Sequence, residues 1–387
     1  MPTSPALADR PVPDAAPSPP RDPADERPTL VVTCGDPSGI GPEVVALAWA
    51  RTAAHARARL RVVADPAALA AVLGRRRGLP RLAINAVTAA DMRASRPDEL
   101  LVIQSPTGAQ GGASADSSVV DGTISAAGGA AAMAALDAAI ATVRIGHADA
   151  IVTGPLHKEA LRAAGCDAPG HTELLARACG LADDAASMML WLPTGSGPGG
   201  LGVVHATLHE SLRTALDRLS AEGIAAAGRR LADVLPALLG RRPRIAVAAL
   251  NPHGGEGGLF GDDERRLVAP AVEALATTGL EVSGPLPADT LFLRASRGEF
   301  DGVVALHHDQ GHIPVKLLGM HRAVNVTLGL PLVRTSVAHG TAFDIVGRGQ
   351  ADPASMLAAI DAALRLVDAG WPARRPAAAT VASAPAP

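Results

Sequence analysis

The sequence predicts an α/β protein with a mainly parallel, helix-covered sheet, and its length allows one large or two medium domains. Two observations predict this fold. Short apolar or β-branched runs alternate with helical stretches along most of the 387 residues, an order typical of parallel sheets covered by helices. Polar, glycine-rich segments follow the ends of most of these runs, which is where open α/β sheets bind ligands.

The expected elements begin with a strand at 30–33, a glycine-rich turn at 34–43 and a helix from Val44. Further strands are expected at 60–64, 100–103, 148–153, 202–206, 244–250 and 302–306. Helical stretches separate them at 126–144, 211–219, 225–239 and 262–277, among others. Residues 193–202, rich in glycine and proline, are expected to form a loop or a hairpin tip.

Composition excludes several classes of protein. The formal net charge of −3 gives no basic excess for nucleic acid or an anionic membrane. Three widely spaced cysteines without a C-x-x-C pair argue against disulfides and thiolate metal sites, so we expect a cytoplasmic protein. The Pro- and Ala-rich ends, residues 1–28 and 373–387, are expected to be disordered tails. With no tyrosine, proton transfer must fall to His, Asp, Glu, Lys or water.

Lysine is almost missing from the chain. Only Lys158 and Lys316 occur among 35 basic residues, and the other basic residues are arginines. A lysine ammonium is a compact charge that can lose its proton, whereas an arginine guanidinium is permanently charged. We therefore interpret both lysines as markers of an active site.

Histidines gather near the ends of three expected strands, as the pair His205 and His209, the single His253, and the group His307, His308 and His312. Three neutral nitrogen ligands leave a divalent cation its full charge and open positions for a substrate, as in catalytic metal sites. Spacing alone does not choose within each group. For any one histidine taken alone, local capping or hydrogen bonding is the alternative.

Two other segments indicate anion and nucleotide binding. Residues 170–173 (GHTE) open a helical run whose backbone N–H groups suit a phosphate or carboxylate. Lys316, Asn325 and Arg334 lie on neighbouring segments and are candidates for an anion cradle. The loop at 336–353 suits a nucleotide, although no G-x-G-x-x-G fingerprint with a following acidic residue is present.

Six motifs in order resemble the 4-hydroxythreonine-4-phosphate dehydrogenase (PdxA) family, over roughly residues 29–368. They are GDPSGIGPE at 35–43, GPLHK at 154–158, GHTE at 170–173, LNPH at 250–253, GPLPADTLF at 284–292 and HDQG at 308–311. The first motif and the segment 339–353 also resemble the wider isocitrate/isopropylmalate dehydrogenase fold.

The resemblance implies a role for each matching residue. It places metal ligands at His209, His253 and His308, substrate contacts at His171, Thr172, Lys316, Asn325 and Arg334, and NAD or NADP contacts at His339, Gly340, Thr341 and Asp344. It implies one divalent metal per site, zinc, magnesium or cobalt. It also implies a homodimer whose active site takes metal ligands from both subunits.

The same resemblance implies two α/β domains, each with a mainly parallel sheet, with a cleft between them. Residues 29–150 and 310–372 would form the first domain, with the cofactor loop at 336–353. Residues 151–309 would form the second, which carries metal ligands and the dimer contact. Lys158 and Asp289 are the candidates for proton transfer.

The implied reaction is oxidation of 4-hydroxy-L-threonine 4-phosphate at its C3 hydroxyl, followed by decarboxylation to 3-amino-2-oxopropyl phosphate, in pyridoxal 5'-phosphate biosynthesis. Residues 205–211 and 307–314 are more similar to a terephthalate dihydrodiol dehydrogenase. A dehydrogenase of such a cis-dihydrodiol, or of a four-carbon sugar-acid phosphate such as threonate or erythronate phosphate, is therefore an alternative. A phosphate acyltransferase and a non-catalytic binding protein are the alternatives from other classes.

Overall fold

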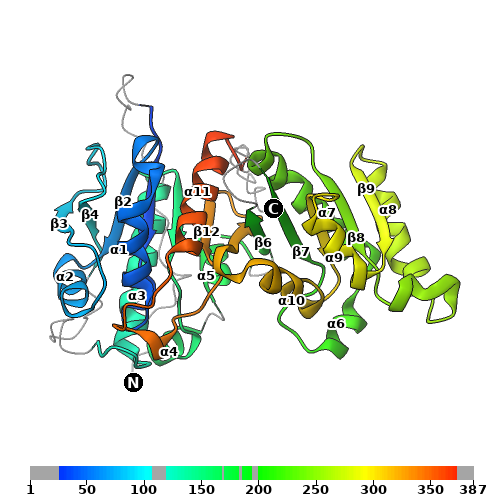
Figure 1. Ribbon diagram of the computed structural model, residues 1–387, viewed down its shortest axis with the longest axis horizontal. Helices are drawn as coiled ribbons and strands as arrows, with labels where there is room; N and C mark the ends of the chain where they lie inside the picture. Colours follow the sequence, from blue (N-terminus) through cyan, green and yellow to red (C-terminus); the bar gives the residue numbers. More distant parts are fainter. Residues whose placement is uncertain (1–25, 107–118, 168–169, 183–184, 194–198, 373–387) are drawn as a thin grey trace, which may run out of the picture.

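A computed structural model describes residues 26–106, 119–167, 170–182, 185–193 and 199–372, apart from the side chain of His171. The two expected tails lie outside these residues except for 26–28. The described chain forms one sheet of twelve strands, in the order β3-β4-β2-β1-β5-β12-β11-β6-β7-β10-β8-β9. In Figure 1 the early elements (blue and cyan) lie on one side, the middle of the chain (green and yellow) on the other, and β12 and α11 between them.

One half of the sheet is parallel and comes from the N-terminal part of the chain plus one late strand. Its elements are β1 (Thr29–Thr33), α1 (Gly41–Arg51), η2 (Ala53–Ala56), β2 (Arg59–Ala64), α2 (Pro66–Arg75), β3 (Ala83–Val87), β4 (Glu99–Gln104), α3 (Ala126–Arg144), β5 (Ala150–Thr153), α4 (Lys158–Ala163), α5 (His171–Ala178) and β12 (Val333–Val337). Thr29–Thr33 and Ala150–Thr153 are buried throughout, as strands covered on both faces must be.

The other half contains the middle of the chain. Its elements are β6 (Ser187–Pro193), β7 (Gly200–His205), α6 (Leu212–Arg218), α7 (Ala221–Leu239), β8 (Arg244–Ala248), η4 (Pro252–Gly258), η5 (Glu264–Val268), α8 (Ala269–Ala276), β9 (Glu281–Leu286), α9 (Ala288–Ser296), β10 (Gly302–Ala305), α10 (His308–Gly319), η6 (Met320–Arg322) and β11 (Val324–Leu328). After β12 come η7 (Phe343–Ile345) and α11 (Ala354–Asp368).

The seven expected strands are confirmed as β1, β2, β4, β5, β7, β8 and β10. The expected helix at 126–144 is α3, whose N-cap Ser125 accepts a hydrogen bond from the N–H of Gly128 at 3.0 Å. The expected hairpin is formed by β6 and β7, which pair antiparallel from Met189 and Val204 to Pro193 and Gly200. Residues 194–198 at its tip lie outside the described residues.

Strand direction reverses in the middle of the sheet. β11 runs antiparallel to both β12 and β6, and β6 runs antiparallel to β7. The sheet therefore continues without a break through both expected domains. The parallel strands of one half run opposite to those of the other half.

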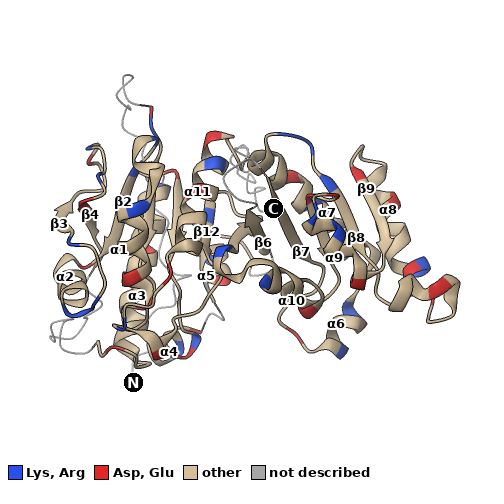
Figure 2. Ribbon diagram, in the orientation of Figure 1, with Lys and Arg blue, Asp and Glu red and all other residues tan. Residues whose placement is uncertain are grey.

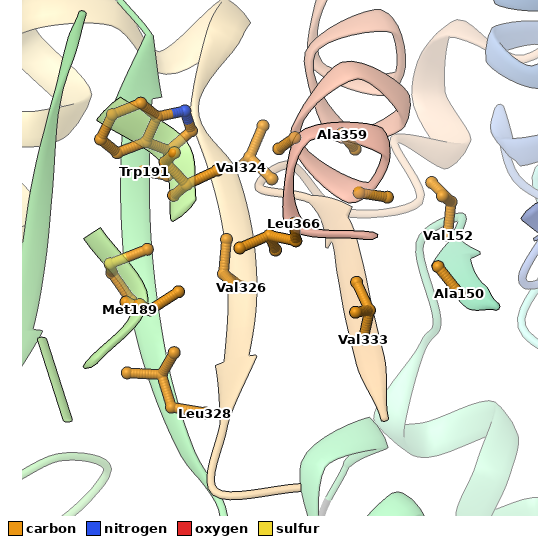
Figure 3. Packing of buried hydrophobic residues seen from close by; sticks show 14 of the residues in the cluster. Ala150, Val152, Met189, Trp191, Val324, Val326, Leu328, Val333, Ala359 and Leu366 are labelled. Atoms are coloured by element: carbon orange, nitrogen blue, oxygen red, sulfur yellow. The ribbon is translucent and has the colours of Figure 1, made fainter. Parts of the chain in front are cut away.

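The alternation of side chains in β11 and β12 gives the central strands two different faces. Val324, Val326 and Val333 are buried in the main apolar cluster together with Ala359 and Leu366 of α11. Figure 3 shows these valines gathered around that helix. Because successive residues of a strand point to opposite faces, the intervening Asn325, Thr327, Arg334 and Ser336 are directed to the other side of the sheet. The polar face of the central strands is thus fixed by packing against α11.

Helix α3 is the one described helix that is long and apolar enough to cross a membrane. It packs against β1, β2 and β5. Ala135, Leu136, Ala139 and Ile140 are buried in an apolar cluster that also contains Val31 and Ile151. These contacts are those of a core helix that covers a sheet.

Candidate active site on the polar face of the central strands

A cleft of about 800 Å³ lies on the polar face of the central strands. Its floor includes Met188 and Leu190 of β6, Asn325 of β11, and Arg334 and Ser336 of β12. Its walls come from the ends of β5 and β7 and from the first turns of α4, α5 and α10. Figure 2 shows basic residues on α4 and α10, two of the helices that border the cleft. The cleft is therefore wide enough for a small anionic molecule and has positive charge on its walls.

Arg334 forms the buried cationic centre of the cleft floor. Its side chain is 3% exposed, and its Nη1 and Nη2 atoms donate hydrogen bonds to Oγ1 of Thr327 (3.0 Å) and Oγ1 of Thr153 (2.6 Å). Burial lowers its pKa to about 9, so it remains charged at neutral pH. Nε of Arg334 and Oδ1 of Asn325 are buried without a hydrogen-bond partner among the described residues. Such groups are rare in native proteins, which makes these two atoms candidates for contact with a ligand, an ion or a water.

The other expected substrate contacts border the same cleft. Lys316 lies on the exposed side of α10, and Thr172 lies in the first turn of α5. His171 begins α5, but its side chain lies outside the described residues. Glu173, which sequence reasoning did not single out, also lines the cleft, and its charge acts on both Arg334 and His209. The structure thus brings four of the five expected substrate contacts, Thr172, Lys316, Asn325 and Arg334, to one cleft.

His209 and His308 face one another at the other end of the cleft, with ring centroids 5.9 Å apart. Nδ1 of His308 lies 2.7 Å from Oδ1 of Asp309. Because a carboxylate accepts, Nδ1 carries the proton and Nε2 of His308 keeps its lone pair, which is the tautomer that metal-binding histidines use. Burial, the charge of Lys158 and the neighbouring His308 lower the pKa of His209. Both imidazoles are suited to bind a divalent metal ion.

His253 does not lie in this cleft. It is exposed in η4, at the start of a run of six residues with positive φ, from His253 (φ 54°) to Gly258 (φ 107°). His209 also has a left-handed backbone, with φ of 56°, a conformation that is uncommon outside glycine. Among the described residues, no three His, Cys, Asp or Glu side chains lie close enough to hold a metal ion. One chain therefore brings together two of the three expected ligands.

The two candidates for proton transfer lie in different places. Lys158 begins α4, lines the cleft and lies near enough to His209 for its charge to act on that ring. Asp289 lies exposed in the first turn of α9, a helix that contacts η4, and it does not line the cleft. Within one chain, Lys158 therefore lines the cleft, whereas Asp289 lies on a helix that contacts the segment of His253.

The expected cofactor loop packs on the glycine-rich turn after β1. The N–H of Ile40 donates to the carbonyl of Thr341 (2.9 Å), and the N–H of Gly347 donates to Oε1 of Glu43 (3.2 Å). A Cβ atom on Gly39 would lie 2.7 Å from the carbonyl oxygen of Thr341, so glycine is required for this approach. His339 lines the cleft, while Gly340 and Asp344 are exposed nearby. The loop thus lies beside the cleft with backbone and carboxylate groups free for a nucleotide.

An α/β protein with a buried arginine and paired imidazoles in one cleft, beside a glycine-containing loop, has features that fit a metal-assisted dehydrogenase. The family comparison supports this class. The family described as "Pyridoxal phosphate biosynthetic protein PdxA" matches residues 56–363. The chain belongs to the PdxA family, and the resemblance of its motifs is confirmed.

Several relatives in this family are dehydrogenases. The chain is 43% identical over 338 residues to the D-threonate 4-phosphate dehydrogenase of Cupriavidus necator, covering 87% of this chain and 96% of the relative. It is 42% identical over 339 residues to the 4-hydroxythreonine-4-phosphate dehydrogenase of Beijerinckia indica, covering 87% and 94%.

Solved structures agree with this family assignment. The 4-hydroxythreonine-4-phosphate dehydrogenase of Klebsiella pneumoniae superposes with a TM-score of 0.73 at 40% identity, covering 88% of this chain and 98% of that one. The terephthalate 1,2-cis-dihydrodiol dehydrogenase of Burkholderia xenovorans is more distant, with a TM-score of 0.56 at 33% identity, covering 89% and 99%.

Proposed function

We propose that this protein is an NAD- and divalent-metal-dependent dehydrogenase that oxidises the C3 hydroxyl of 4-hydroxy-L-threonine 4-phosphate, after which the product loses CO2 to give 3-amino-2-oxopropyl phosphate. The observation that carries the proposal is that buried Arg334 and the pair His209 and His308 line the same cleft. A four-carbon phosphorylated hydroxy acid has a phosphate on C4, the reacting hydroxyl on C3 and a carboxylate at C1, so it needs both anion contacts and a group that activates the hydroxyl.

The phosphate group is assigned to the floor of the cleft. Arg334 is held rigidly by Thr153 and Thr327, so its remaining donors are already oriented before a ligand binds. Asn325 and Lys316 add an amide and an ammonium, and the N-terminal N–H groups of α5 add further donors beside Thr172. This arrangement favours a phosphorylated substrate over a non-phosphorylated cyclic diol.

The metal site is assigned to His209, His308 and His253 of the partner subunit. A divalent ion there would withdraw electron density from the C3 hydroxyl and the carboxylate of the substrate. Neutral imidazole ligands suit zinc or cobalt better than magnesium. Leu259 and Phe260, which follow η4 closely, are 73% and 46% exposed, and Leu317 on α10 is 83% exposed. These exposed apolar side chains would be buried against a second copy of the chain. Their exposure therefore supports a homodimer in which each η4 segment would complete the cleft of the other subunit.

The chain's own residues account for the proton and the cofactor. Lys158, next to His209, is the candidate to take the proton of the hydroxyl, and Asp289 of the partner subunit is the alternative. The loop with His339, Gly340, Thr341 and Asp344 is assigned to NAD, which would supply the hydride acceptor, and His339 of this loop lines the cleft. His209 and His308 would hold the metal ion that orients the reacting hydroxyl.

D-threonate 4-phosphate is the second candidate substrate, because a relative with that name is 43% identical to this chain. It carries a hydroxyl where hydroxythreonine phosphate carries an ammonium. Both molecules present the same phosphate and the same C3 hydroxyl, so the same residues would bind them.

The test is to incubate the purified protein with NAD and zinc or cobalt ions, supply each of the two phosphorylated substrates in turn, and follow NADH absorbance. We expect NADH to form with one or both substrates and to disappear after chelation. The dihydrodiol of terephthalate serves as the third substrate in the same assay. NADH formation with neither phosphorylated substrate, in protein loaded with metal, would contradict the proposal.

A further inference from the structure

Two buried histidines, His205 and His312, lie beside the proposed metal site. His205 ends β7 and is 9% exposed, and His312 lies one turn into α10 and is 7% exposed. Nδ1 of His312 lies 3.1 Å from Nε2 of His205, although the two residues are 107 positions apart in the chain. Buried imidazoles that contact each other in a cleft wall call for a physical explanation, because their polar atoms must be desolvated.

The contacts of His312 favour one of its two tautomers. Nδ1 of His312 also lies 3.2 Å from the carbonyl oxygen of His308. Because a carbonyl oxygen only accepts, we assign the proton to Nδ1 of His312, and Nε2 of His205 is then the acceptor in the contact between the two rings. The ring of His312 is thus held between a strand and the first turn of its own helix.

This held ring stacks on His308. The centroids of the His308 and His312 rings are 3.8 Å apart and their planes are inclined by 9°. The Nδ1 atom of His308 is held in addition by Asp309, at 2.7 Å. His308 is thus held by stacking on one face and by a hydrogen bond at Nδ1, and it lines the cleft together with His209.

Helix α10 is built to lie directly against His205. A Cβ atom on Gly311 would lie 2.3 Å from Nε2 of His205, 2.9 Å from Cγ1 of Val203 and 3.0 Å from Cβ of Ala305. Glycine at this position therefore allows the helix that carries His308 to contact the strand that leads to His209. The hydrogen bond between His205 and His312 joins these two elements at the point of closest approach.

We infer that His205 and His312 are positioning residues, which join β7 to α10 through the Nδ1–H donor of His312 and so hold His308 in the orientation that binds the metal ion. The inference rests on the metal site of the proposed function. It assigns the two histidines a role in metal affinity, although neither is a ligand.

The test compares matched substitutions in the full-length protein. In His312→Asn the amide nitrogen takes the place of ring Nδ1 and keeps the donor to His205. In His312→Gln the amide lies at the place of Nε2, and that donor is lost. His205→Gln keeps an acceptor near Nε2, whereas His205→Leu removes it. His321→Gln, an exposed histidine after the same helix, is the control.

The measurement is zinc affinity, by competition with a chromophoric chelator, together with the urea midpoint of the metal-free protein. We expect His312→Gln and His205→Leu to bind zinc about 10- to 100-fold more weakly, while His312→Asn, His205→Gln and His321→Gln stay close to the wild type. The double variant His205→Leu/His312→Gln should lose no more affinity than either single variant, because both remove one hydrogen bond.

The outcomes separate this inference from the proposed function. If the wild type does not bind zinc, or binds it equally well with His308→Ala, the proposed metal site fails and the inference with it. If the wild type binds zinc through His308 but His312→Gln and His205→Leu bind it equally tightly, the inference alone is overturned. A purely structural role is shown if both substitutions at 312 lower the urea midpoint alike and neither changes zinc affinity, which also overturns it.

Discussion

Nη2 of Arg334 on β12 donates a hydrogen bond to Oγ1 of Thr153 on β5, 2.6 Å away, in the buried floor of the cleft. This contact joins the last strand of the sheet to the strand that leads to Lys158. It orients the guanidinium before any ligand arrives, and two predictions depend on that end of the cleft.

Arg334→Lys should weaken binding of the phosphorylated substrate. A lysine supplies a single ammonium in place of the planar guanidinium of Arg334, whose orientation is fixed by hydrogen bonds to Thr153 and Thr327. We expect KM for the substrate to rise about 10- to 100-fold, as for the loss of a charged hydrogen bond, with little change in KM for NAD. Steady-state kinetics measures both constants, and the exposed Arg297→Lys serves as the control. An unchanged substrate KM would remove Arg334 from the phosphate site.

Lys158→Met and Lys316→Met should act on different constants, although both residues line the cleft. If Lys158 takes the proton, its substitution lowers kcat by about 100-fold or more and leaves substrate affinity nearly unchanged. Lys316→Met should instead raise KM for the substrate, because the ammonium group of Lys316 is proposed to bind the phosphate. Single-turnover kinetics and substrate titration distinguish the two. If Lys158→Met turned over as fast as the wild type, Lys158 would not be the base, and Asp289 would be the remaining candidate for the proton step.

A mixture of His253→Ala and His308→Ala subunits should regain activity that neither variant has alone. In a mixed dimer one cleft has intact His209 and His308 and receives intact His253 from the partner subunit. Random exchange of subunits should restore roughly a quarter of wild-type activity. NADH formation after subunits are mixed, unfolded and refolded together measures it. No recovery in mixed dimers that are shown to form would contradict a site shared between subunits.

Gly39→Ala should weaken binding of the cofactor and leave binding of the substrate unchanged. The added Cβ would lie 2.7 Å from the carbonyl oxygen and 2.8 Å from Cβ of Thr341, so the cofactor loop must move. Overpacking of this kind costs about 1–3 kcal/mol, and we expect KM for NAD to rise roughly 5- to 100-fold. Gly74→Ala is the matched control, since a Cβ there meets no atom within 4 Å. Equal rises in KM for NAD and for substrate would argue against a cofactor loop.

His205 should make the metal-free protein less stable in weak acid. Burial and the neighbouring His312, His308 and His209 rings lower the pKa of His205 from 6.5 to about 3. Below about pH 6.5 the unfolded chain takes up a proton that the folded chain refuses, so the free energy of unfolding falls as the pH drops from 6.5 toward 3. Urea unfolding at about pH 7 and about pH 5 should show a larger fall for the wild type than for His205→Leu. The His321→Gln variant should show the same fall as the wild type.

Apolar runs predicted most of the sheet but missed its centre. Val324–Leu328 and Val333–Val337 alternate apolar and polar residues, so neither contains a continuous apolar run. Their period of two residues is the remaining sequence signal, and it also separates the buried valines from Asn325 and Arg334. A search for alternation would have placed these two residues on one face of a sheet.

Other features of the site depend on distant contacts. The strand-end rule placed the histidine groups that contain His209 and His308 at the ligand-binding edge, the family resemblance chose these two, and the structure brings them together. The same rule cannot show that His253, the first of six positive-φ residues after β8, lies outside the cleft. Nor can it show that His312 meets His205 across 107 positions, because that contact needs the small size of Gly311.

The left-handed backbone at His209 and His253 lowers the stability of the fold at both positions. An L-amino acid in this conformation gives up about 1–2 kcal/mol that glycine would retain. Glycine, as at Gly254, Gly255 and Gly257 beside His253, takes up the same backbone conformation without this cost. A variant with glycine at 209 or 253 would therefore exchange an imidazole for a more stable backbone, so at these two positions metal binding and fold stability make opposite demands.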